Sequence, residues 1–124
     1  MTMILRVLVG AVGLFNIAIG LLFLFNPAGA AANFFLIPDG SQGMATLRAD
    51  FPGFFITGGS FALIGALQKD GRALLVPVML LAIAITGRAV SLVADGIGPD
   101  AIPPMVAEAV MISLLLLCRS GLKH

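Results

Sequence analysis

The sequence contains no tryptophan and no tyrosine, a single cysteine, a single histidine, and few charged residues, which make up 10% of its 124 residues. Cys118 has no partner for an internal disulfide, and one cysteine with one histidine does not supply the ligands that a zinc site requires. The formal net charge is +1 and there is no basic block, so nucleic-acid binding is not expected. No P-loop and no paired Ser and His are present either, and we expect no metal and no cofactor.

Apolar residues are abundant instead. They make up 60% of the sequence, and the mean hydropathy is +1.12, whereas an average soluble domain has roughly 25% charged residues. The apolar residues form segments long enough to cross a bilayer, which takes about 20 residues. We predict an all-α, four-helix transmembrane bundle, a single integral membrane domain with spans at about 3–25, 46–67, 73–94 and 104–118 and a longer outer loop at 26–45.

The first apolar segment has a competing interpretation as a secretory signal peptide, because Arg6 is a charged residue near its start and Ala28-Gly29-Ala30 resembles a cleavage site. The apolar run exceeds the ~7–15 residues of a normal signal-peptide core, which favours a span. Gly13, Asn16 and Gly20 share one helical face and are expected to lie against other helices.

The outer loop contains Ala28–Leu36, which suits a short helix in the membrane interface, and Asp39–Gly43, for which a turn and disorder are both open. Pro52 lies in the first turns of the second span, where a proline is tolerated. It would kink the helix if the helix began earlier.

Arg88 lies about six residues inside the third span, where an ionisable group costs ~2.5–3.5 kcal/mol unless it is compensated. Counting residues from the span ends places Asp50, Asp95 and Glu108 near the depth of Arg88. Arg48 is two residues from Asp50 and is expected to point elsewhere, toward headgroups.

These charges admit a structural interpretation, in which carboxylates and Arg88 tie helices together through a bidentate fork. They also admit a binding site, because two arginines against three acids leave one carboxylate over. A contact with a partner subunit is the third interpretation. The candidate ligand-binding residues are the polar side chains predicted near this depth: Asn16, Arg48, Asp50, Thr57, Arg88, Ser91, Asp95 and Glu108.

The leading hypothesis is a small, non-enzymatic membrane protein whose outer-leaflet polar pocket binds a lipid-like or quinone-like ligand or docks a partner membrane complex. The alternative is a membrane enzyme of the isomerase or cyclase type, with Glu108 or Asp50 as acid or base and Arg88 as electrostatic stabiliser. The expected partners are membrane lipids, a lipophilic small molecule, and a partner membrane protein or a second copy of the chain.

Positive charge is concentrated at one side of the predicted membrane, where Arg6, Lys69, Arg72, Arg119 and Lys123 lie, against Arg48 on the other. Because cytoplasmic loops carry the excess of Lys and Arg, both termini are expected in the cytoplasm.

Two motifs carry a resemblance to a known family. Leu47-Arg48-Ala49-Asp50 is followed by Gly53, and Gly87-Arg88-Ala89-Val90-Ser91 by Asp95-Gly96, with a Glu early in the last span. The whole chain resembles small bacterial four-span membrane proteins of unknown function, which are similar in layout to DoxX-like proteins. The resemblance implies a bacterial inner-membrane protein and carries over Arg48, Asp50, Arg88, Asp95 and Glu108 as family features, but it implies no activity. Pro52 departs from the glycine expected there.

Overall fold

The computed structural model describes residues 2–122, which fold into five helices. These are α1 (Thr2–Phe25), α2 (Pro27–Ala32), α3 (Gly40–Gln68), α4 (Leu75–Ala94) and α5 (Ile102–Leu122). All except the short α2 are long and apolar enough to cross a membrane. Hydrocarbon offers no hydrogen bonds to the backbone, and a helix pairs its own backbone N–H and C=O groups. The exposed surface of these helices is largely apolar, which suits contact with lipid. The predicted all-α bundle of four transmembrane helices is confirmed, and the chain is a membrane protein.

The short helix expected at Ala28–Leu36 is present as α2, although it ends at Ala32, and α3 begins before the predicted start at residue 46. α2 begins at Pro27, and the side chain of Asn26 accepts a hydrogen bond from the N–H of Gly29, as an N-cap residue does. α3 begins at Gly40, within the segment for which a turn and disorder were both open. Pro52 therefore lies inside α3, where its missing N–H leaves the carbonyl of Arg48 without the usual helical partner.

α1 and α3 approach each other closely because glycines face each other along their contact. A Cβ atom built on Gly59 would lie 2.5 Å from the carbonyl oxygen of Gly13, and one built on Gly13 would lie 2.7 Å from the carbonyl oxygen of Gly59. Gly13, Asn16 and Gly20 are all buried, as the shared helical face predicts. Only residues without a side chain permit this distance between two backbones.

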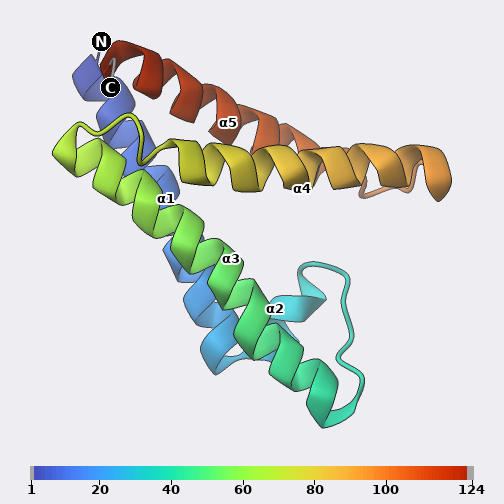
Figure 1. Cartoon of the computed structure of the whole chain (residues 1–124). Helices are drawn as coiled ribbons and strands as arrows, with labels where there is room; N and C mark the ends of the chain where they lie inside the picture. Colours follow the sequence, from blue (N-terminus) through green and yellow to red (C-terminus); the bar gives the residue numbers. More distant parts are fainter. Residues whose placement is uncertain (1, 123–124) are drawn as a thin grey trace.

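The bundle is closed at one end and open at the other. In Figure 1, the start of α4 and the end of α5 lie beside α1 and α3 at the end where the chain termini lie, and the α4–α5 pair diverges from α1 and α3 away from it. At the closed end, one buried core draws on α1, α3, α4 and α5, with Val9, Ala62, Leu81 and Leu115 among its members. At the other end, the buried core consists of residues from α1, α2 and α3 only, namely Phe23, Ala30, Ala31 and Leu47.

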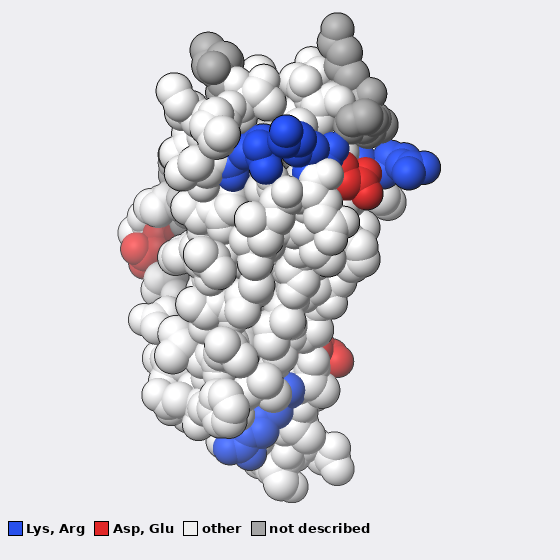
Figure 2. Space-filling model, turned by 90° about the vertical axis from the view of Figure 1, so that its left-hand side faces the viewer, with Lys and Arg blue, Asp and Glu red and all other residues white. Residues whose placement is uncertain are grey.

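The same two ends of the bundle also differ in charge. Figure 2 shows Lys and Arg side chains gathered at the closed end, which we call the basic end and define by Arg6, Lys69, Arg72 and Arg119. Arg6 reaches from α1 to the C-terminus of α3, where its Nε donates to the carbonyl of Ala66 at 2.6 Å and its Nη2 to that of Leu67 at 3.3 Å. The opposite end, which we call the open end, has Arg48 and Arg88 and most of the acids of the chain: Asp39, Asp50, Asp95, Asp100 and Glu108.

Candidate ligand cavity

A cavity of about 460 Å³ lies between the α1–α3 pair and the α4–α5 pair, where the two pairs diverge. All four long helices contribute to its lining, together with the segment after α2. Its walls are mainly apolar, and most of its polar lining atoms come from four side chains: Asn16, Asp50, Arg88 and Glu108. A hollow of this size and character is typical of small-molecule sites, which range over roughly 300–1,000 Å³.

One wall of the cavity is aromatic. It is formed by Phe15 of α1, Phe34 of the segment after α2, and three residues on one face of α3, Phe51, Phe54 and Phe55. Behind it lies the fully buried Phe23, whose ring is 4.8 Å from that of Phe51 and 5.9 Å from that of Phe55, nearly parallel to the latter at 7°. These centroid distances are in the favourable range for aromatic pairs, so the wall is held in place by its own packing.

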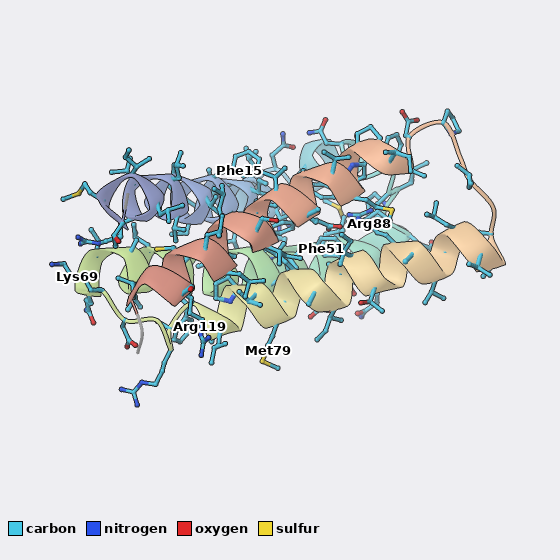
Figure 3. The ribbon with its side chains drawn as sticks, turned by 90° about the horizontal axis from the view of Figure 1, so that it is seen from above. Phe15, Phe51, Lys69, Met79, Arg88 and Arg119 are labelled. Carbon is cyan, nitrogen blue, oxygen red and sulfur yellow. The ribbon has the colours of Figure 1, made fainter. Side chains whose placement is uncertain are left out.

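Arg88 and Glu108 form an ion pair at the opposite wall. Arg88 stands in the second half of α4, and Glu108 in the second turn of the antiparallel α5. The Nε of Arg88 donates to Oε1 and Oε2 of Glu108, both at 3.0 Å. The Glu108 side chain is 10% exposed and that of Arg88 is 38% exposed. Figure 3 shows Arg88 and Phe51 beneath α5, facing the same space, while Lys69 and Arg119 lie at the far end.

The ion pair is not the predicted bidentate fork, in which two guanidinium nitrogens would each bind one carboxylate oxygen. Both carboxylate oxygens of Glu108 are occupied by the single Nε–H group of Arg88. The two terminal Nη atoms of Arg88 donate to no group in residues 2–122, although guanidinium has donors there. Arg88 therefore neutralises Glu108 and keeps further hydrogen-bond donors, and its side chain lines both this cavity and a neighbouring hollow with Ser91 and Asp100.

Asp50 lines the cavity from α3 without a partner. It is exposed, and among residues 2–122 its carboxylate takes part in no hydrogen bond and no ion pair. Arg48 is two positions away, on another face of the helix. Its Nε donates to the carbonyl of Leu24 at 3.3 Å. The prediction that Arg48 and Asp50 point apart agrees with this arrangement.

Asn16 brings an amide to the same cavity from α1. It is only 7% exposed, and its Nδ2 donates to the carbonyl of Val12 at 2.8 Å and contacts the sulfur of Met111 at 3.6 Å. No donor of the described residues reaches its Oδ1. In the described residues the Nε of Arg119 is the buried side-chain atom without a hydrogen-bond partner, so the Oδ1 of Asn16 keeps some exposed surface and can accept a hydrogen bond from a ligand.

The structure separates the eight predicted ligand-binding residues into two groups of four. Four of its members line the cavity: Asn16, Asp50, Arg88 and Glu108. The other four lie elsewhere. Asp95 accepts a hydrogen bond from Ser91 at 2.8 Å at the end of their own helix, Arg48 lies on a groove with Ser41 and Met44, and Thr57 is exposed on α3. Among the acids predicted near the depth of Arg88, Glu108 alone forms an ion pair with it in the described residues.

The aromatic wall was not predicted from the sequence, because only polar side chains were considered as candidate ligand contacts. Phe51, Phe54 and Phe55 follow the i, i+3, i+4 spacing of one helical face, and they adjoin the Asp50 position. That spacing could have indicated the wall on α3. Phe34 gave no such signal, because it belongs to a segment whose position depends on how the chain folds back.

No protein-family model, no curated protein and no solved structure matches this chain. The resemblance to DoxX-like proteins stays a prediction.

Proposed function

We propose that the protein binds a lipophilic ligand in the cavity between its two helix pairs. The observation that carries the proposal is the cavity itself, an apolar hollow of about 460 Å³ inside a membrane protein, lined by one or more polar side chains from each of the four long helices. Most ligand sites combine apolar walls with a few placed polar groups that fix orientation. A lipid-like or quinone-like molecule, with an apolar body and a polar head, has matching chemistry.

The polar groups supply distinct contacts to such a head. The free Nη donors of Arg88 suit a carbonyl or other acceptor, and the Oδ1 of Asn16 suits a hydroxyl or amine. The aromatic wall offers flat faces for ring stacking. Because the walls of the cavity are mainly apolar, each such contact would add more to specificity than it would at a polar surface.

The absence of tryptophan allows a direct test. Phe15→Trp places one fluorophore at the cavity, and Met79→Trp places one on the outer face of α4, where Figure 3 shows Met79 pointing away from the other helices. We expect decylubiquinone, added to each protein in nanodiscs, to quench the Phe15→Trp variant saturably and the Met79→Trp variant only in proportion to its concentration in the lipid.

A cavity-filling variant completes this experiment. Ala84 lines the cavity, and Ala84→Phe in the Phe15→Trp background should abolish the saturable phase while leaving the protein folded by circular dichroism. Equal, unsaturable quenching at both tryptophan positions would contradict the proposal.

We also propose that both termini lie in the cytoplasm of a bacterial cell, with the protein in the inner membrane. The support is the concentration of Lys and Arg at the basic end, which the positive-inside rule assigns to the cytoplasm. In right-side-out vesicles, a membrane-impermeant maleimide should label Asp39→Cys and spare Lys69→Cys. Labelling of Lys69→Cys with Asp39→Cys spared would reverse this orientation, and labelling of both from one side would refute it.

A further inference from the structure

We infer that the ligand of the cavity is a lipophilic cation, a small amphiphile whose positive charge is embedded among apolar or aromatic groups. This inference rests on the proposed function and adds the charge of the ligand. The features that support it are one unneutralised carboxylate, an aromatic wall, and the charge of the open end.

The cavity has an excess of negative charge. It is lined by one cationic side chain, Arg88, and two carboxylates, Asp50 and Glu108. Arg88 and Glu108 are 3.0 Å apart and neutralise each other. The negative charge of Asp50 is therefore the net charge of the side chains that line the cavity.

No other cation among residues 2–122 compensates Asp50. The nearest arginine in sequence, Arg48, donates to the carbonyl of Leu24 on another side of α3. The ion pairs of the described residues are those of Arg88 with Glu108 and of Arg72 with Asp70. A carboxylate beside an apolar cavity gains most from a cation that can itself enter apolar surroundings, since the interaction strengthens as water is excluded.

The aromatic wall favours the same ligand charge. The face of a phenylalanine ring carries the negative part of its quadrupole and attracts cations within about 6 Å, and quaternary ammonium groups are recognised by such rings. Five phenylalanines line the cavity together with Asp50. A neutral ligand would stack on these rings but would gain no charge attraction. An anion would be repelled both by the ring faces and by the carboxylate of Asp50.

The charge of the whole open end acts in the same direction. Asp39 lies at the start of α3, and Asp95 and Asp100 lie between α4 and α5. With these carboxylates, the acids of the open end outnumber its two arginines, Arg48 and Arg88, so this end is negative. Such a field raises the local concentration of cations.

A free amphiphile fits better than a membrane phospholipid. The cavity volume is about 460 Å³, in the range of a drug-sized ligand. A zwitterionic phospholipid would bring its phosphate close to Asp50 whenever its ammonium group approached the rings. A molecule with a single positive centre avoids that repulsion.

The test uses probes of similar shape and different charge. We would measure the affinity of the wild-type protein in nanodiscs for tetraphenylphosphonium, tetraphenylborate and neutral triphenylphosphine oxide by equilibrium dialysis against empty nanodiscs. Tetraphenylphosphonium should bind about tenfold more tightly than the neutral probe, corresponding to ~1.4 kcal/mol, and tetraphenylborate most weakly. This series needs no variant.

Two variants then locate the effect. Asp50→Asn should reduce the affinity for tetraphenylphosphonium about tenfold and leave that for the neutral probe unchanged. Asp95→Asn removes a carboxylate of the same end that does not line the cavity, and it should change neither affinity by more than about twofold.

The outcomes separate this inference from the proposed function. Saturable binding of all three probes with equal affinity, or strongest binding of tetraphenylborate, would overturn the cation inference and keep the ligand cavity. No saturable binding of any probe would contradict both. A loss of tetraphenylphosphonium affinity on adding phosphatidylethanolamine to the nanodiscs would show that a lipid headgroup occupies the cavity, and would overturn the choice of a free amphiphile.

Discussion

At the basic end of the molecule all four long helices share one buried core, whereas at the open end the buried core belongs to α1, α2 and α3 alone. The buried residues of α4 are Pro77 and Leu81, both in its first half. In α5 the buried residues lie mostly toward its C-terminal end, and Glu108 is the exception. Apolar packing therefore holds all four long helices together at the basic end, whereas at the open end it joins α1, α2 and α3, and the cavity lies between them and the α4–α5 pair.

The two ends of the molecule therefore differ in what holds the helices together. The basic end supplies stability through interdigitated apolar side chains, which are sensitive to small changes in volume. At the open end, the ion pair of Arg88 with Glu108 joins α4 to α5 beside the cavity. Three sets of substitutions test this comparison, in order of decreasing effect.

The largest effect is expected at the glycine contact of α1 with α3. Gly59→Leu would place its Cβ against the backbone oxygen of Gly13, at a 2.5 Å separation that no rotamer change relieves. We expect a loss of about 3 kcal/mol or more in unfolding free energy. Gly53→Leu is the matched control in the same helix, because a Cβ there meets no atom within 4 Å. Thermal unfolding followed by circular dichroism in one detergent should separate the two, and equal melting temperatures would show that α1 and α3 are not in close contact.

A smaller effect is expected at the ion pair. Arg88→Met and Glu108→Met each remove a charged hydrogen-bond partner, and each should cost about 2 kcal/mol, the middle of the usual range for such bonds. The double variant should lose less than the sum of the singles, because removing both partners leaves no unpaired charge. Unfolding free energies of the four proteins give the coupling, and additive losses would mean that the pair does not tie α4 to α5.

The smallest effect is expected at the C-terminus of α3. Arg6→Met removes two hydrogen bonds to the carbonyls of Ala66 and Leu67 and a positive charge at the negative end of the helix dipole. The expected loss is about 1 kcal/mol. Arg72→Met is the control, since Arg72 is 81% exposed and 3.9 Å from Asp70, and it should change stability by less than about 0.5 kcal/mol. Indistinguishable denaturation curves for the two would show that Arg6 does not stabilise α3.

The fold was largely predictable because hydrocarbon restricts the choices of the backbone. Apolar runs of sufficient length must form helices, and Arg88 among them required an acidic partner. The polar face of α1 was also predictable, because Gly13, Asn16 and Gly20 repeat with the helical period. The start of α3 was not, since the residues between Gly40 and Thr46 carry little apolar signal and join the helix only through continuity with the span after them.

The candidate site was predictable in its kind and only partly in its members. Counting residues gives the depth of a side chain in the membrane, and by depth Asp50, Asp95 and Glu108 were equivalent. Which acid meets Arg88 depends on the rotation of each helix and on its lateral neighbours, and the α4–α5 hairpin brings Glu108 within reach.

The amino-acid sequence by itself determined a membrane protein of four helices with charged groups that need compensation, because length, hydropathy and helical period are local properties. Only the tertiary structure decided that Arg88 is neutralised by Glu108, that Asp50 is left alone, and that phenylalanines from α1, α3 and the segment after α2 share one wall with it. The physical reason is that the two helix pairs share an apolar core at one end and diverge at the other. The contents of the space between them are set by packing angles that no single segment encodes.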